Sequence, residues 1–273
     1  MKIYKIEEIL KKLENCIEYK IPFSHIRFGD GGIKYLHAVL FNDQDQLKTI
    51  IKKEGIPKTK ILEVFELWGY YARKADFIDT PEVYYQDNFW PRVKGPGKSI
   101  NPKTNERMLM WRELYDRAEF FNENYCNPES NYLMITKIKG NKTLVDIMKN
   151  RKIAVITAKP EVKNPLRKFD PTIIKIVGHY ENQYKNSFTQ VVEQIENTAK
   201  NYDFWLVAAG ELGRIYTGLI KEHGGRAVDI GFVAEYWLGE GIHPRLTSYL
   251  RQNWNNSLEL YLTYVGKKYE DYI

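Results

Sequence analysis

The feature that most constrains the fold is an alternation of apolar, strand-like segments with helical patterns between residues 152 and 230. The strand-like segments are short and rich in Ile, Val and Ala, whereas the helical segments repeat apolar residues at spacings of three and four. Strands interleaved with helices form a mostly parallel sheet whose faces are covered. The predicted strands are 152–157, 172–177, 204–209 and 226–230, and the predicted helices are 187–200 and 212–223.

The N-terminal third predicts one further strand and a layer of helices. Residues 24–28 are short and β-compatible, and a glycine-rich turn and a helical pattern follow them. An apolar stripe from Ile3 to Ile17 predicts an amphipathic first helix. Further helical patterns cover about 44–54, 59–74 and 104–122. The residues expected to face the core are Ile33, Leu36, Leu40 and Phe41 after the glycine turn, and Ile61, Leu62, Phe65, Trp68 and Gly69 within 59–74.

Together these patterns predict an α/β fold: a Rossmann-like, mostly parallel sheet with flanking helices and an N-terminal helical portion. We expect a single domain over residues 1–273 with a helical insertion at about 42–130, because a chain of this length with 43% hydrophobic residues can bury a full core. Residues 93–102 have the Gly, Pro, Ser and Asn density of a mobile loop, which we interpret as a candidate lid.

Composition narrows the function classes without choosing one. The net charge of +6 is compatible with nucleic acid, an anionic membrane surface or a phosphorylated small molecule. No apolar run approaches the ~18 residues that span a membrane, and the N-terminus lacks the apolar core of a secretory signal, so we expect a cytoplasmic protein. Cys16 and Cys126 lack metal-type spacing and predict two reduced thiols. The 14% aromatic content suits an enzyme that stacks rings on sugars, although ordinary packing accounts for most of these residues.

The first glycine-rich turn stands where ligands bind in a parallel sheet, after the carboxyl end of a strand and before a helix. Gly29, Gly31 and Gly32 let backbone amides approach a ligand, and a helix start offers about half a positive charge to an anion such as a diphosphate. Asp30 would repel a diphosphate unless a divalent cation lay between them. Alternatively, Asp30 caps a helix that begins near Ile33. The sequence leaves both interpretations open.

The second turn, Gly210-Glu211-Leu212-Gly213-Arg214, also joins an apolar strand to a helix. It lacks the three-glycine pattern of dinucleotide sites, and no Gly-Lys-Ser/Thr follows, which disfavours both an NAD site and a P-loop. Arg214 is suited to bind phosphate in a two-pronged geometry, or else to form a salt bridge with Glu211 or another local acid.

Polar residues after the last predicted strand complete the candidate site. Asp229 alternates out of an apolar strand, where a buried carboxylate needs a partner, and it could hold a ribose hydroxyl or orient an arginine. Glu235 and His243 are the candidate general bases, with a structural role as the alternative for each.

The run His25-Ile26-Arg27-Phe28-Gly29-Asp30-Gly31 and the segments 206–210 and 224–231, about 180 residues later, resemble the bacterial glycosyltransferases of the GT-D fold. The resemblance implies a Rossmann-type enzyme that uses a nucleotide-sugar donor, typically a UDP-sugar. In the family an Arg-Phe-Gly-Asp-Gly-Glu turn supplies an Asp-x-Glu metal motif. Asp30 matches the Asp of this motif, and Arg27 and Gly29 match the Arg and Gly that precede it.

Two departures from the family pattern concern its chemistry. The motif's Glu is Gly32 in this chain, and one carboxylate binds a divalent ion far more weakly than two. The family tends to have a histidine after the late Asp-Ile-Gly, where this chain has Phe232. Three options follow: Mn²⁺ or Mg²⁺ held by Asp30 with the diphosphate and water, metal-free catalysis with Arg27, Arg214 or a lysine as an electrostatic clamp, or a subgroup with different chemistry.

We therefore predict a glycosyltransferase that moves a sugar from a nucleotide-sugar donor to a glycan or glycoprotein acceptor, with Asp30, Glu235 and His243 as candidate catalytic residues. No nucleic-acid partner is expected, and peripheral membrane contact stays open. One alternative is a degenerate nucleotide- or sugar-binding module or scaffold of a glycosylation complex, which Gly32 and Phe232 favour. Another is a different phosphate-handling enzyme on the same sheet, such as a nucleotidyl- or methyltransferase. The predicted donor-binding residues are Arg27, Phe28, Gly29, Asp30, Gly31, Gly32, Gly210, Glu211, Arg214 and Asp229.

Overall fold

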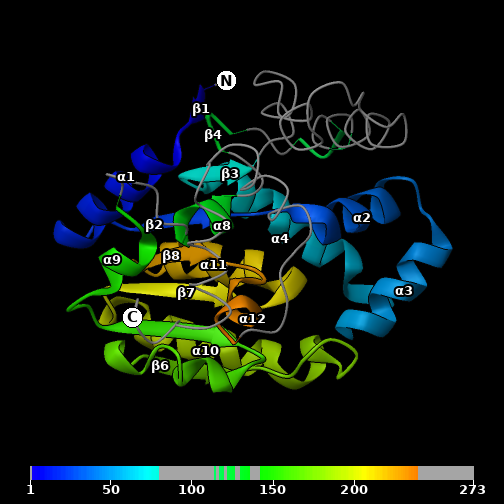
Figure 1. Ribbon diagram of the computed structural model, residues 1–273. Helices are drawn as coiled ribbons and strands as arrows, with labels where there is room; N and C mark the ends of the chain where they lie inside the picture. The colour runs from blue at the N-terminus through cyan, green and yellow to red at the C-terminus, as the bar shows by residue number, and fades with distance from the viewer. Residues whose placement is uncertain are drawn as a thin grey trace, which may run out of the picture.

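A computed structural model describes residues 2–79, 114, 117–119, 122–126, 130–135 and 142–238. In this part of the chain an eight-stranded sheet forms the centre of the molecule, and every strand pairing in it is parallel (Figure 1). The predicted α/β fold with a parallel sheet is confirmed. The strands are β1 (Lys2–Tyr4), β2 (Phe23–Ile26), β3 (Phe77–Asp79), β4 (Asn124–Cys126), β5 (Ile153–Thr157), β6 (Thr172–Lys175), β7 (Phe204–Ala208) and β8 (Arg226–Asp229), in the spatial order β1-β4-β3-β2-β8-β7-β5-β6.

Helices bury both faces of this sheet, because successive side chains of each strand point to opposite faces. In β5, Ala154 and Ile156 enter one apolar cluster, whereas Ile153 and Val155 enter the other. The first cluster is covered by α2 (Gly29–Leu40), α4 (Ile61–Lys74), α10 (Thr189–Thr198) and α11 (Gly213–Glu222), with α3 (Gln44–Glu54) packed on α2. The second is covered by α1 (Ile6–Glu18), α8 (Ser130–Ile135), α9 (Leu144–Met148) and α12 (Val233–Trp237).

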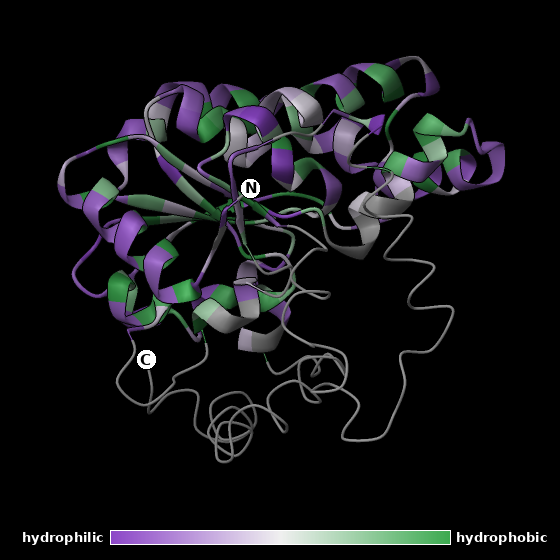
Figure 2. Cartoon of the chain, turned by 90° about the horizontal axis from the view of Figure 1, so that it is seen from above, coloured by the Kyte–Doolittle hydropathy of each residue, from purple (hydrophilic) through white to green (hydrophobic). Residues whose placement is uncertain are grey.

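The hydropathy of the helices fits this layered arrangement. Figure 2 shows hydrophilic and hydrophobic residues alternating along the helices, as expected where each helix buries one side only. Short helical turns join several elements, namely η1 (Lys58–Lys60), η2 (Pro160–Lys163), η3 (Arg167–Phe169), the π-helical η4 (Tyr184–Phe188), η5 (Ala199–Asn201) and η6 (Gly210–Leu212). Among the described residues, no helix combines the length and the apolarity needed to cross a bilayer.

Local capping explains why α3 falls at the predicted residues 44–54. The Asp43 side chain accepts the N–H groups of Asp45 and Gln46, at 3.2 and 3.1 Å, which satisfies amides that the first helical turn leaves unpaired. At the other end Gly55 adopts a φ of 70°, the left-handed conformation that commonly ends a helix.

Three predictions about the N-terminal part were wrong. Ile3 lies in β1 rather than in the first helix, because residues 2–4 pair with β4 and α1 begins only at Ile6. Phe41 and Leu62 do not face the core, and their exposed fractions are 43% and 64%. The range 42–130, expected to be a helical insertion, contributes β3 and β4 to the sheet. The candidate lid at 93–102, and the helix at 104–122 apart from residues 114 and 117–119, lie outside the described residues.

The contact between α11 and α4 gives a test of the packing. A Cβ at Gly218 would lie 2.2 Å from Cγ and Cδ1 of Tyr71, atoms near the root of a buried ring. We predict that Gly218→Ala lowers the free energy of unfolding by about 1–3 kcal/mol, since overpacking outweighs the gain in helix propensity. Urea denaturation measures this change.

Gly213→Ala, in the same helix, is the matched control. There the nearest atom to an added Cβ is 3.4 Å away, so no loss of stability is expected. Equal unfolding free energies for the two variants would contradict the close packing of α11 on α4.

Candidate functional site

The two glycine-rich turns, far apart in the sequence, meet at one edge of the sheet. Strands β2, β8 and β7 are consecutive neighbours and run parallel, so their carboxyl ends lie at the same edge. The first turn follows β2, the second follows β7, and Ile230 and Gly231 follow β8. Loops at the carboxyl ends of parallel strands form the ligand-binding edge of open α/β sheets.

Arg214 joins the two turns directly. Its Nη2 donates a hydrogen bond to the carbonyl of Phe28, and its Nη1 donates to the carbonyl of Gly210 at 3.2 Å. Nη1 also lies 2.6 Å from Oε2 of Glu211. Of the two interpretations of Arg214, the structure thus shows the salt bridge with Glu211.

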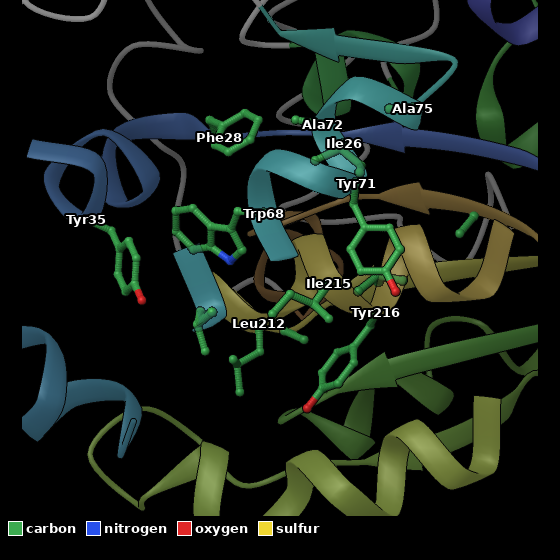
Figure 3. Packing of buried hydrophobic residues seen from close by; sticks show 14 of the residues in the cluster. Ile26, Phe28, Tyr35, Trp68, Tyr71, Ala72, Ala75, Leu212, Ile215 and Tyr216 are labelled. Carbon is green, nitrogen blue, oxygen red and sulfur yellow. The ribbon is translucent and has the colours of Figure 1, made fainter. Parts of the chain in front are cut away.

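The Arg214–Glu211 pair is enclosed by apolar and aromatic side chains. The Arg214 guanidinium stacks over the Trp68 ring, with 4.6 Å between its central carbon and the ring centroid. Figure 3 shows Phe28 and Tyr35 on either side of Trp68. Burial raises the pKa of Glu211, whereas the charge of Arg214 acts to lower it. Such a buried pair holds structure together, because removing one partner would leave an uncompensated charge.

Asp229 ties the end of β8 to the end of β2. Its Oδ2 accepts the backbone N–H of Arg27 at 3.3 Å, and its Oδ1 accepts that of Gly231 at 3.0 Å. The residue is almost fully buried, and this burial raises its pKa, while Arg27 and Arg214 act in the opposite direction. The carboxylate therefore fixes the backbone around Arg27.

Asp79 is a site residue that the sequence analysis missed. Both of its carboxylate oxygens lie near the backbone N–H of Phe28, at 3.1 and 3.0 Å, and the residue is fully buried. It ends the apolar strand β3 in the way that Asp229 ends β8. An aspartate closing a short apolar run was the signal that could have identified it.

The start of α2 overturns one of the two interpretations of Asp30, that it caps a helix beginning near Ile33. The helix begins at Gly29, with Phe28 as its N-cap and no side-chain capping hydrogen bond. Asp30 is consequently inside the first turn and is not the cap of a helix beginning near Ile33. The structure describes only the backbone of Gly29, Asp30 and Gly31.

The position of Gly32 bears on the metal motif that the resemblance implies. A Cβ at Gly32 would lie 2.8 Å from Nη2 of Arg214. A glutamate there would require Arg214 to move away from the Phe28 carbonyl. The residues of this chain thus do not fit a two-carboxylate metal site. Among the described residues, no group of three His, Cys, Asp or Glu side chains is placed to hold a metal ion.

The remaining candidate residues lie at different places in the structure. Arg27 lies beside the β8 loop, since a Cβ at Gly231 would be 2.6 Å from its Nη1. Asn131, on α8, donates to the Ile230 carbonyl at 2.8 Å and fixes the same loop. Glu235 lies in α12 and is half-buried, whereas His243 is outside the described residues. Phe232, at the family's histidine position, is 55% exposed.

A second polar cluster was also missed by the sequence analysis. Glu54, the last residue of α3, is fully buried, and its Oε1 lies 3.1 Å from Nδ1 of His179 and 3.2 Å from Nζ of Lys53. Burial would raise the pKa of Glu54, but its interactions with His179 and Lys53 outweigh this effect and lower it. No local motif marks these residues, because their partners come from distant segments.

Comparison with known protein families matches residues 99–237, just over half of the chain, to the GT-D fold-like domain. The chain belongs to this GT-D-like family. The match contains the second turn and Asp229 but begins after the first turn. Arg214 and Asp229, both inside the matched region, bind the backbone of the first turn. No curated protein and no solved structure matches the chain.

The role of Asp229 can be tested by stability measurements. Asp229→Ala removes the acceptor of two backbone N–H groups, and we predict a loss of about 1–3 kcal/mol in the free energy of unfolding. Asp229→Asn keeps one acceptor oxygen and is expected to lose less. Wild-type stability of Asp229→Ala in urea denaturation would contradict the assigned contacts.

The Glu54 cluster predicts a pH dependence of stability. Because the folded-state pKa of Glu54 lies below its unfolded value, its stabilising contribution is complete above that unfolded value, about 4.3, and is lost as the pH falls through the lower folded value. Wild type should therefore lose more stability than Glu54→Gln as the pH falls below about 4. If the free energies of unfolding of the two proteins changed equally with pH across this range, the charged form of Glu54 would not be stabilised by its partners.

Proposed function

We propose that this GT-D-like protein is a glycosyltransferase that takes a sugar from a nucleoside-diphosphate sugar, most simply a UDP-sugar, and transfers it to a glycan or glycoprotein. The observation that carries the proposal is the assembly of the β2, β7 and β8 loops around the start of α2. That helix start has no side-chain cap, so its first backbone N–H groups can donate hydrogen bonds to an anion.

Sugar transfer requires stabilisation of the departing nucleoside diphosphate as the glycosidic bond breaks. The backbone N–H groups at Gly29–Gly31 and the Arg27 guanidinium are the groups suited to this task. Arg27 is only half-buried, and its backbone is held on both sides, because Asp229 accepts the N–H of Arg27 and Asp79 accepts the N–H of Phe28. Arg214 and Asp229 support the site, since Nη1 and Nη2 of Arg214 and both carboxylate oxygens of Asp229 contact protein groups.

Of the three options for the chemistry, namely a metal held by Asp30, metal-free catalysis with arginines as an electrostatic clamp, or a different chemistry, this assignment favours the arginine clamp. A Cβ at position 32 would lie 2.8 Å from Nη2 of Arg214, so a guanidinium occupies the space that the motif's second carboxylate would need. A divalent ion bound by Asp30, the diphosphate and water is the competing option, which chelation tests.

The donor site can be tested by thermal unfolding with UDP, GDP and their sugar conjugates, each with Mn²⁺, Mg²⁺ or EDTA. A ligand at a hundred times its dissociation constant stabilises the fold by about 2.7 kcal/mol, and we expect a UDP-type ligand to raise Tm with EDTA present. Loss of the shift in EDTA would establish the metal option instead. No shift with any nucleotide would overturn the proposed donor site.

Asp30→Asn tests the first turn in the reaction itself. If Asp30 holds a divalent ion against the diphosphate, we predict a strong fall in donor hydrolysis and transfer with an unchanged unfolding midpoint, because the substitution removes the only carboxylate of this turn. On the arginine clamp, removing this negative charge beside the diphosphate should leave both rates unchanged or raised. Asp45→Asn is the matched control: Asp45 is also in the first turn of a helix, α3, and its side chain is 93% exposed. Equal activity of the two variants would remove Asp30 from the mechanism.

A binding or scaffold module without turnover is the second candidate, and Gly32 together with the exposed Phe232 favours it. Binding and turnover separate the two candidates. A Tm shift with nucleotide-sugars but no hydrolysis or transfer with any acceptor would identify the module.

A further inference from the structure

His179 lies at the same edge of the sheet as the proposed donor site. It belongs to the loop that follows the carboxyl end of β6, and its ring packs against the second glycine turn. A Cβ at Gly210 would lie 2.6 Å from Cε1 of His179, and Gly210 has a φ of 53°. Only glycine gives both the space for this ring and the backbone conformation.

Glu54 lies against the imidazole next to Gly210, since a Cβ at Gly210 would also be 3.5 Å from Oε2 of Glu54. The 3.1 Å separation between its Oε1 and Nδ1 of His179 pairs a fully buried carboxylate with one ring nitrogen. A carboxylate in this position favours the proton on Nδ1, which leaves Nε2 as the atom that accepts a proton. The His179 side chain is 35% exposed, and its Nε2 has no hydrogen-bond partner among the described residues.

The loop that carries His179 is held firmly. The backbone N–H of Tyr180 donates to the Lys53 carbonyl at 2.6 Å, and Nε2 of Gln183 donates to the Ala209 carbonyl at 3.1 Å. Tyr180 adopts a φ of 67°, in the left-handed region that tyrosine rarely occupies, and Asn182 adopts a φ of 54°, which asparagine tolerates. Strained conformations of this kind persist where surrounding contacts enforce them, and they concentrate at functional sites.

Contacts also connect His179 to the proposed donor site. Its ring packs on Gly210, and the guanidinium of Arg214 donates to the carbonyls of both Gly210 and Phe28. The imidazole is therefore separated from the first turn by Gly210 and one arginine side chain.

We propose that His179 is the acid–base residue of the transfer reaction and that Glu54 is its positioning residue. The inference rests on the proposed glycosyltransferase function. Nε2 of His179 takes the proton of the acceptor hydroxyl as the acceptor oxygen bonds to the anomeric carbon. The bond from that carbon to the diphosphate breaks, and its electron pair leaves with the nucleoside diphosphate. Glu54 stabilises the imidazolium that forms.

Four charged side chains surround the imidazole of His179. Glu54 and Lys53 face it from α3, and Glu211 with its partner Arg214 lies beyond Gly210. The two carboxylates and the two cations balance in formal charge.

The test compares transfer kinetics and donor binding in His179→Ala. We expect kcat to fall by about 10²- to 10⁴-fold, the usual contribution of a general base, while the donor-induced Tm shift is unchanged. Added imidazole should restore part of kcat, and the variant should lack the decline of kcat at acid pH that a general base gives wild type. Glu54→Gln should reduce kcat with little change in KM, and Glu54→Asp should recover part of the loss.

His37→Ala is the matched control, because His37 lies 3.8 Å from Asp43 in a similar half-buried pair and is outside the proposed site. It should keep wild-type kcat. Wild-type kcat in His179→Ala, or a loss that imidazole does not restore and that leaves the pH profile unchanged, would overturn the inference while the proposed function stands. Absence of any donor-induced Tm shift in wild type would instead refute the proposed function.

Discussion

The architecture of the site depends on one buried guanidinium. Arg214, at the start of α11, donates to the Phe28 carbonyl, 186 positions earlier in the chain, and to Gly210 and Glu211 in its own turn. Trp68 lies under this group, and Gly32 leaves space for it. Through these hydrogen bonds, Arg214 fixes the distance between the loop after β2 and the loop after β7, which lie in different halves of the sheet.

Aspartates at the ends of strands complete this framework. Asp79 and Asp229 bind consecutive backbone N–H groups, of Phe28 and Arg27, from β3 and β8 on the two sides of β2. Their buried carboxylates compensate amides that the turn would otherwise leave unpaired. The backbone of the first turn is therefore fixed before any ligand arrives, which lowers the entropy lost on binding.

The structure also places a second group of ionisable residues beside this framework. Glu54, His179 and Lys53 lie across Gly210 from Arg214, and burial makes their mutual charges effective. One edge of the sheet thus combines a helix start suited to anions with an imidazole suited to proton transfer. Both His179 and Arg214 lie within the region that matches the GT-D fold-like domain.

The sequence by itself determined the strands and helices between residues 152 and 230, because burial imposes periodicities of about 2 and 3.6 that can be read locally. It also located the two glycine-rich segments and indicated the family through its motifs, although the first segment proved to be the start of α2. Very short elements such as β1 and β4 escaped detection, since three residues carry no period. Only the tertiary structure decided that Asp79 holds Phe28, that Arg214 pairs with Glu211, and that Glu54 meets His179. Such contacts depend on the spatial order of the strands, and that order brings together side chains whose separation along the chain leaves no local pattern.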